Sequence, residues 1–147
     1  MFQRRYLIHL SLAVVALVII LYPYYKNKPD TAKVAAASSA AVSFLQLLDA
    51  GEYEESWHLG SAYLQADIPL ETWLEQVSAV RQQVGPLQQR SQTDVSYTRA
   101  PVEGIPEGEY LSFFYLSDFE AKKQAKERVT LYLEGDGIWR VAGYFVE

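Results

Sequence analysis

Few side chains in this sequence have the chemistry of a catalytic or metal site. Cysteine is absent, which excludes thiol nucleophiles, thiolate zinc sites and disulfides. His58 is the single histidine beyond the apolar N-terminal stretch, and it follows Trp57 on a predicted helix. At such a position a solvent-exposed side chain is the ordinary outcome, so we do not expect a catalytic base. The acids between residues 49 and 55 do not follow a calcium-loop spacing. We therefore expect no metal and no cofactor.

Three arginines of the C-terminal part have two interpretations. Arg81, Arg90 and Arg140 lie close in sequence to apolar residues, which indicates that at least one of them is partly buried. A structural role would be an ion pair with Glu109 or Glu127, two acids on predicted neighbouring strands, which would fix the register of a sheet. A functional role would be capture of a ligand carboxylate by the planar guanidinium. The structural role is favoured because a buried arginine needs a partner.

Aromatic residues give the candidate ligand site. If a curved sheet cradles helices, the concave mouth between them is the default position for a small-molecule pocket. The candidate lining residues are Trp57, Trp73, Tyr110, Tyr115, Trp139, Arg140 and Tyr144. On an unbroken last strand, Arg140 and Tyr144 would share one face. The same aromatic residues also occur at the spacings of a helix or strand core, so packing is the alternative role for most of them.

The first half of the domain that would hold this pocket has the hydrophobic period of helices. An amphipathic helix is expected where apolar residues recur between 34 and 48, ending at the Asp-Ala-Gly of 49–51. A second, shorter helix is expected from Tyr53 to Leu64. A third begins after Pro69, carries an apolar stripe through Val84, and ends at Gly85-Pro86. The sequence thus predicts three consecutive helices.

Beyond Leu87 the apolar period changes from that of helices to that of strands. Strands are expected around 95–98, 110–116, 129–133 and 138–146, with a turn-rich loop at 101–108 and a tight hairpin at Gly135-Asp-Gly137. A parallel sheet would need helices between the strands, and only the short charged stretch 119–126 is available for one. We predict an α+β domain, three N-terminal helices packed on one face of a curved four-stranded antiparallel sheet, preceded by one transmembrane helix.

The N-terminus carries a hydrophobic segment, the twenty uncharged residues from Tyr6 to Tyr25, that is long enough to cross a bilayer. Three tyrosines stand at its C-terminal end and lysines follow, as at a membrane interface, whereas a cleaved signal peptide would have small residues there. We expect a retained signal anchor over residues 1–25, a linker over 26–33 and the soluble domain over 34–147. Cleavage as a signal peptide is the alternative.

The distribution of charge indicates where the soluble domain works. From residue 30 onward there are nine Lys or Arg against all 18 acids. Such a domain repels phosphate backbones, so we expect no nucleic-acid partner. Arg4 and Arg5 precede the hydrophobic segment, which favours a cytoplasmic N-terminus. We expect a single-pass protein of the bacterial inner membrane with its C-terminal domain in the periplasm.

An ordered series of short motifs gives a resemblance over roughly residues 35–145. The series contains D-A-G-E-Y at 49–53, the tryptophans at 57 and 73, G-I-P-E-G-E-Y at 104–110, and the closing D-G-I-W-R-V-A-G-Y at 136–144. It resembles the bacterial domain of unknown function 4019 family. The closing motif also ends many cone-shaped α+β domains similar to nuclear transport factor 2. The resemblance implies a compact domain behind a signal or anchor, with no activity, cofactor or catalytic residue to carry over.

Three functional hypotheses remain on these grounds. The first is a membrane-anchored extracytoplasmic module that binds an envelope protein partner or a small ligand without catalysis. The second is a small isomerase or hydrolase that uses His58 or a carboxylate such as Asp118, together with a tyrosine, in a pocket between sheet and helices. The third gives the anchor itself a role, as a packed helix of an envelope assembly. A buried carboxylate facing a cavity beside Tyr110 or Tyr115 would favour the enzyme, and an interior filled by side chains would not.

Overall fold

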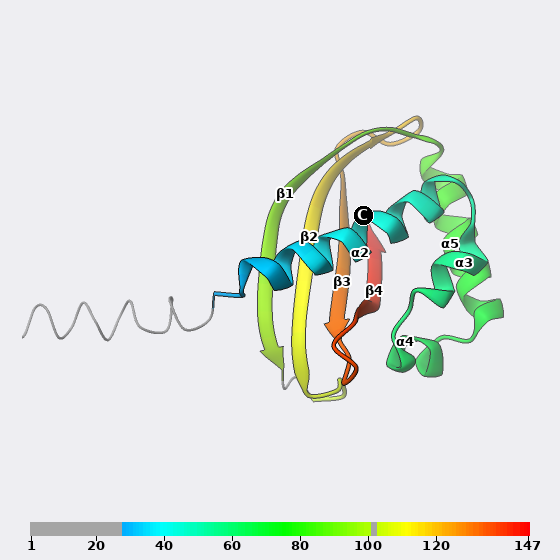
Figure 1. Cartoon of the computed structure of the whole chain (residues 1–147). Helices are drawn as coiled ribbons and strands as arrows, with labels where there is room; N and C mark the ends of the chain where they lie inside the picture. Colours follow the sequence, from blue (N-terminus) through cyan, green and yellow to red (C-terminus); the bar gives the residue numbers. More distant parts are fainter. Residues whose placement is uncertain (1–27, 101–102) are drawn as a thin grey trace, which may run out of the picture.

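The described part of the chain folds as four helices followed by a four-stranded sheet (Figure 1). This fold is seen in a computed structural model that describes residues 28–100 and 103–147. The helices are α2 (Thr31–Asp49), α3 (Tyr53–His58), α4 (Ala62–Asp67) and α5 (Leu70–Val84). The strands are β1 (Leu87–Ala100), β2 (Gly108–Phe119), β3 (Ala125–Leu133) and β4 (Trp139–Val146). Helices and strands are thus segregated along the chain, as the change of hydrophobic period predicts.

Helix α2 begins at a cap and packs its apolar face on the sheet. The side chain of Asp30 accepts a hydrogen bond from the backbone N–H of Ala32 at 3.0 Å, which satisfies one of the free amides of the first turn. Its buried residues recur every three to four positions and are Ala37, Ala41, Phe44, Leu45 and Leu48. The helix ends at Asp49, and Gly51 follows with a φ of 77°, a conformation that glycine adopts without strain.

The second predicted helix is two short helices, α3 and α4, because the chain pairs with the sheet between them. Gly60 forms a parallel bridge with Val141 of β4. The N–H of Val141 donates to the carbonyl of Leu59 at 3.0 Å, and the N–H of Ser61 donates to the carbonyl of Val141 at 2.7 Å. The hydroxyl of Ser61 then caps α4. A tertiary contact therefore interrupts a pattern that is continuous in the sequence.

The sheet is an open antiparallel meander with the order β1-β2-β3-β4. Strand β1 is much longer than predicted. Residues 88–94 are all polar and, apart from the partly buried Arg90, exposed, so they give no alternating apolar pattern, yet most of them pair with β2. The charged stretch after Phe119 is a turn rather than a helix. The predicted hairpin is present, with Gly137 at a φ of 79°. The fold class predicted from the sequence is confirmed.

A bulge in β4 changes which residues share a face. Thr130 pairs with Gly143 while Leu131 pairs with Val141, so one extra residue of β4 lies between the two pairs. After this shift Tyr144 lies opposite the buried Val129 on the helix-covered face, whereas Arg140 lies opposite Tyr132 on the other face. The expectation that Arg140 and Tyr144 share a face is wrong for this reason.

The space between α2 and the helix-covered face of the sheet is filled by side chains. Phe44 of α2, Phe113 of β2, and Val129 and Leu131 of β3 are fully buried and belong to one cluster. A smaller cluster, Val84, Phe119 and Ala125, closes the end where α5 meets β1. The interior is therefore a packed core.

The predicted anchor, Tyr6–Tyr25, lies outside the described residues. Within the described part, one helix near the N-terminus, α2, has the length and apolar composition of a membrane span. The inward face of α2 belongs to the core described above. The core helix of a soluble domain meets the same criteria of length and composition, so this property alone does not make α2 a span.

Candidate functional site

Four charged residues meet where the helices join the sheet, and we call them the charged cluster: Asp49, Arg81, Arg90 and Glu127. They come from the end of α2, the last turn of α5, β1 and β3. The side chain of Glu127 is fully buried, that of Arg81 is 5% exposed, and those of Arg90 and Asp49 are 13% and 24% exposed. Two carboxylates thus face two guanidinium groups in a mostly desolvated site.

Glu127 is the centre of this cluster, because four polar groups surround its carboxylate. Arg90 donates from Nε to Oε2 at 2.6 Å and from Nη2 to Oε1 at 3.1 Å. The hydroxyl of Ser117 donates to Oε2 at 2.7 Å, and that of Tyr144 to Oε1 at 2.6 Å. Nη1 of Arg81 lies 3.7 Å from Oε1. A buried carboxylate requires this degree of compensation.

Asp49 joins both arginines to the end of α2. It accepts from Nη2 of Arg81 at 2.7 Å and from Nη1 and Nη2 of Arg90 at 2.7 and 3.0 Å. Burial acts to raise the pKa of Asp49, but the hydrogen bonds and charges of Arg90 and Arg81 outweigh it, and the pKa is lowered from its ordinary value. For Arg90, burial acts to lower the pKa, and Asp49 and Glu127 more than reverse this. Asp49 and Arg90 are therefore both held in their charged forms.

Two tyrosines extend the cluster toward the core. Burial, and then the charge of Glu127, raise the pKa of Tyr144, so its hydroxyl stays protonated and donates to the carboxylate. Burial also raises the pKa of Tyr115. Among the described residues, the Tyr115 hydroxyl and Nη1 of Arg81 are the buried side-chain polar atoms without a hydrogen-bond partner. The guanidinium of Arg81 also lies over the ring of Phe119, 5.0 Å from its centroid.

The chemistry of this cluster is that of an internal ion-pair network. Its charges balance, and each carboxylate oxygen of Glu127 is already bound by protein donors. A hollow of about 430 Å³ lies beside it, lined by Tyr53, Gly85, Pro86 and the ends of α2 and α5, and its charged lining residues, Asp49 and Arg81, bind each other. The network therefore ties the helices α2 and α5 to the strands β1 and β3 through side chains.

The structural interpretation of the arginines is correct for Arg81 and Arg90, with Glu127 as the shared partner. Arg140 instead bonds Glu134 at 2.6 Å and Asp136 at 2.8 Å within the β3–β4 hairpin. Glu109, the other expected partner, is bound by Lys33 of α2 at 2.7 Å. Lys33 and Glu109 thus form a second link between α2 and the sheet.

The predicted pocket residues do not converge on one cavity. Trp73 is buried in the core, where Nε1 donates to Ser56 Oγ at 3.1 Å. Trp139 is also buried in the core. Tyr110 lies on the opposite face of the sheet, stacked on Tyr132 with ring centroids 4.9 Å apart.

The other predicted pocket residues lie in three further places. Trp57 is partly buried and donates from Nε1 to the carbonyl of Ile68 at 2.9 Å. Arg140 lies on the hairpin, and Tyr115 and Tyr144 lie next to Glu127. The structure therefore brings Tyr115 and Tyr144 together beside a carboxylate, and Tyr144 also lines a groove with Trp73.

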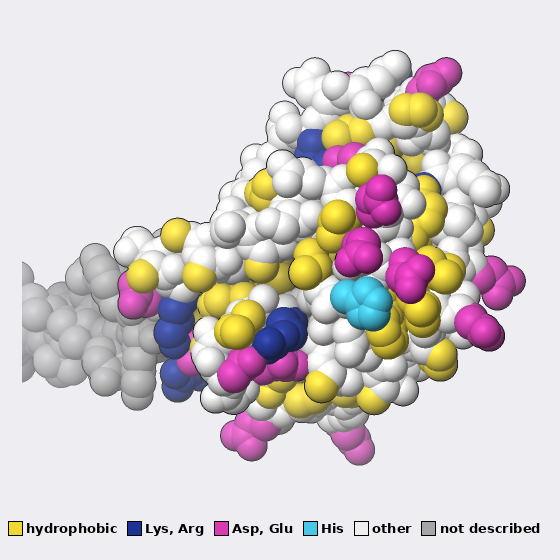
Figure 2. All heavy atoms as spheres, turned by 45° about the vertical axis from the view of Figure 1, so that its right-hand side comes forward, with side chains coloured by type: hydrophobic (Ala, Val, Ile, Leu, Met, Phe, Trp, Pro, Cys, Tyr) yellow, Lys and Arg dark blue, Asp and Glu magenta, His cyan; other side chains and the backbone are white. Residues whose placement is uncertain are grey.

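His58 is exposed, as expected, and its ring lies edge to face with that of Trp57, with the ring centroids 5.3 Å apart. Figure 2 shows acidic side chains gathered around it on the helical layer. The described residues contain no group of three or more His, Asp or Glu side chains arranged to hold a metal. In the sequence, residues 34–80 hold seven acids and no Lys or Arg. This acidic helical surface was not identified from the sequence, although its composition is visible there.

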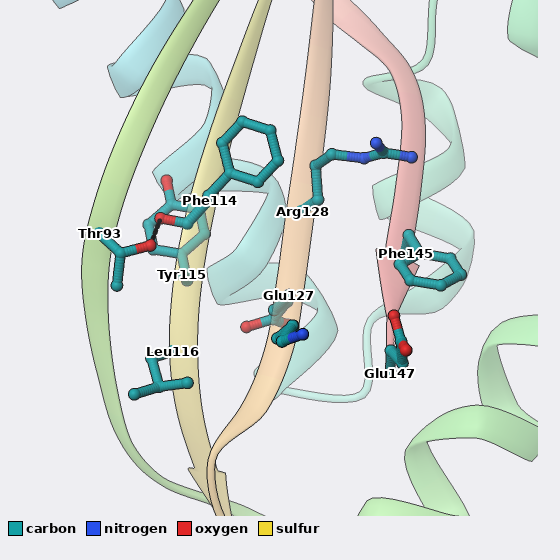
Figure 3. A pocket seen from close by; sticks show the side chains of 9 residues that line it. Thr93, Phe114, Tyr115, Leu116, Glu127, Arg128, Phe145 and Glu147 are labelled. Atoms are coloured by element: carbon teal, nitrogen blue, oxygen red, sulfur yellow. Dashed lines mark hydrogen bonds between the residues drawn. The ribbon is translucent and has the colours of Figure 1, made fainter.

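Two further hollows lie on the surface of the sheet. One, of about 560 Å³, lies on the face away from the helices (Figure 3), where Phe114, Leu116 and Phe145 are surrounded by polar and charged side chains. The other is an apolar groove of about 290 Å³ between β4 and the helices α4 and α5. We call it the β4 groove; its lining residues are Leu64, Ile68, Trp73, Gln76, Val77, Val80 and residues 143–146. Neither was predicted, since each depends on how far apart packed elements lie.

Asp49 was also missed, because the sequence presents it as part of a helix-ending motif. One signal was available. An acid in the last turn of a helix faces the negative end of the helix dipole, which is unfavourable without a cation nearby. The sequence also gives a signal for Glu127, because an acid at an inward position of β3, between Ala125 and Val129, needs a cationic partner.

The comparisons with known proteins agree with this architecture. A solved structure of a protein from Catenulispora acidiphila is similar over 79% of this chain and 91% of that chain, with a TM-score of 0.53 and 16% sequence identity. At that identity the likeness shows the fold alone. No curated protein matches the chain. The family described as "Protein of unknown function (DUF4019)" matches residues 40–144. That range covers most of the helices and of the sheet and all four residues of the charged cluster, and the chain therefore belongs to the DUF4019 family.

Proposed function

We propose that this chain is a membrane-tethered, extracytoplasmic module that binds a partner protein or small ligand and does not catalyse a reaction. The observation that carries the proposal is the contrast between interior and surface. The interior is packed, with Phe44, Phe113 and Leu131 fully buried. The hollows that accept a partner are open and lie at the sheet surface and along β4.

The charged cluster supports binding over catalysis. An acid or base needs a free lone pair or proton within reach of a substrate. Glu127 is the buried carboxylate beside Tyr115 that an isomerase or hydrolase would use, but Arg90, Ser117 and Tyr144 already bind it. The exposed His58 lies at the end of α3, outside the charged cluster. The cluster is better suited to holding the layers together.

Tethering and location rest on the sequence. The apolar segment Tyr6–Tyr25 with basic residues before it favours an anchored protein whose acidic domain lies outside the cytoplasm. The test is a C-terminal fusion to a reporter that is active only outside the cytoplasm, produced from the full chain. Activity in the membrane fraction supports the proposal. An inactive fusion, or a soluble mature chain that lacks the apolar segment, overturns it.

Binding is tested by site-specific photo-crosslinking in cells. A photoreactive amino acid is placed singly at Phe114 on the outer sheet face, at Val80 in the β4 groove and at Gln89 of β1 as an exposed reference. A discrete adduct at one of the first two positions, absent at the third, supports a binding module. The same pattern obtained with an exchanged anchor sequence excludes the anchor as the binding element. Uniformly absent adducts overturn the proposal.

A further inference from the structure

The outer edge of β4 is incompletely paired in the described part of the chain. β4 is the last strand of the sheet. Its outer edge is bridged at Val141, where Leu59–Ser61 run alongside it like the beginning of a fifth strand. The chain then turns away into α4. Among the described residues, no strand pairs with the outer edge of β4 from residue 142 to residue 146. This open stretch of the edge is about 16 Å long, at 3.3 Å per residue.

The register indicates which backbone groups point outward along this open stretch. Glu147 and Lys126 exchange both of their backbone hydrogen bonds, at 2.9 Å each. In an antiparallel pair, residues alternate between hydrogen-bonded and non-hydrogen-bonded positions. Tyr144 and Val146 therefore direct their N–H and C=O groups away from β3. An edge of this kind is a template for another strand.

The β4 groove lies directly against this edge. Its far wall is the apolar face of α5, with Trp73, Val77 and Val80, and its floor is formed by residues 143–146. A strand added to β4 would place alternate side chains in this groove and the others on the outer face of the sheet. The groove volume of about 290 Å³ suits a few small apolar side chains.

The charged residues next to the groove in sequence indicate which charge a bound strand carries. Asp67 precedes the lining residue Ile68, Glu75 precedes Gln76, and Glu147 follows Val146, and all three acids are exposed. No Lys or Arg occurs between residues 34 and 80. The nearest arginine in sequence, Arg81, is turned into the charged cluster and bound to Asp49. An occupant with positive charges at its ends is therefore favoured.

From the open edge, the adjacent apolar groove and its acidic surroundings together, we infer that the β4 groove binds a short extended segment of a partner protein by strand addition. The segment carries small apolar residues at alternate positions and Lys or Arg at both ends. This inference rests on the proposed function and names the kind of partner and the place where it binds.

The test uses the full chain in phosphatidylcholine nanodiscs, with empty nanodiscs as the blank. The probes are two fluorescent peptides, KKVSVSVKK and its charge-reversed form EEVSVSVEE. Anisotropy titrations are expected to show at least about tenfold weaker binding of the acidic peptide, which corresponds to about 1.4 kcal/mol. Hydrogen exchange with the basic peptide is expected to slow at the amides of Tyr144 and Val146. Equal affinity for both peptides, or unchanged exchange at these amides, overturns the inference.

A matched pair of variants separates edge pairing from general loss of packing. Val146→Pro removes an outward N–H that the ladder with β3 does not use, whereas Val146→Ala removes more of the side chain but keeps that N–H. Binding lost in V146P and retained in V146A supports strand addition, provided that both keep the native fluorescence of the core. Equal binding by both variants overturns it.

Two other results have defined meanings. Slow exchange at Tyr144 and Val146 without peptide, seen with two chains per nanodisc and not with one, identifies a second copy as the occupant and overturns the inference of a different partner. A negative peptide result together with cellular adducts at Phe114 places binding on the outer sheet face. In that case the strand-addition inference fails while the proposed function stands.

Discussion

Removing the charge of Glu127 tests the role of the charged cluster directly. Glu127→Gln keeps the shape of the side chain but leaves two guanidinium groups facing one carboxylate, Asp49, in a site where the glutamate side chain has no exposed surface. Breaking a buried ion pair from one side costs about 3–5 kcal/mol, because the remaining charge is uncompensated. For a domain of this size the loss corresponds to a decrease in Tm on the order of 10–20 °C.

The assay is urea unfolding of the full chain in detergent, followed by the fluorescence of Trp57, Trp73 and Trp139. Trp73 and Trp139 are buried in the core, so their emission reports its loss. The matched control is Asp136→Asn, the same loss of charge on the exposed hairpin, where Asp136 bonds Arg140. This control is expected to change the unfolding midpoint by a small fraction of the Glu127→Gln effect, because solvent screens an exposed pair.

A double-mutant cycle separates desolvation from packing. Arg90→Met alone leaves Glu127 with weaker compensation and is expected to be destabilising. The second single variant is Glu127→Leu. The double variant, Glu127→Leu with Arg90→Met, restores the charge balance, because Asp49 and Arg81 still bind each other. The double variant is therefore expected to lose less stability than the two single changes added together. Strictly additive effects, or a Glu127→Gln cost below about 1 kcal/mol, would refute the view that the cluster is a desolvated network.

The remaining predictions concern single groups. Tyr115→Phe is expected to be neutral or stabilising by about 1 kcal/mol in urea unfolding, because it removes an unpaired buried hydroxyl, whereas Tyr144→Phe removes a hydrogen bond to a carboxylate and is expected to cost about 1.5–3 kcal/mol. Gly60→Ala is expected to cost about 1–3 kcal/mol, since an added Cβ would lie 2.8 Å from a backbone oxygen, and Gly135→Ala, with open space around it, is the control for the unfolding midpoint. The lowered pKa of Asp49 means that its contribution to stability is complete above its ordinary value of 3.8 and is lost as the pH falls through the folded-state value. If the urea midpoint of Asp49→Asn falls with decreasing pH as much as that of the unaltered protein, Asp49 is not the source of this acid sensitivity.

The class and order of the elements follow from local rules, which explains why the sequence predicts them. Helix α2 has a stripe of apolar residues at helical spacing and ends at the Asp-Ala-Gly of 49–51. The strand period after Leu87 and the glycine at 137 likewise depend on residues that are near one another in the chain. Family membership follows for the same reason, because the motifs of residues 40–144 form an ordered local series.

The errors in the prediction occur where distant segments meet. The contact of Gly60 with Val141 divides a helix, and the bulge beyond Val141 turns Arg140 away from Tyr144. The length of β1 is set by pairing with β2 rather than by its own polar residues.

The charged composition of the chain is readable from the sequence, but the pairing of the charges is not. The sequence places arginines beside apolar residues, and because a buried arginine needs an acidic partner, it makes Glu127 a candidate partner. Only the tertiary structure decided that Asp49 completes the network and that the predicted pocket aromatics divide between core, opposite face and cluster. Hydrophobic period is fixed by neighbours a few residues apart, whereas ion pairs, groove walls and free strand edges depend on the separation of elements brought together by packing.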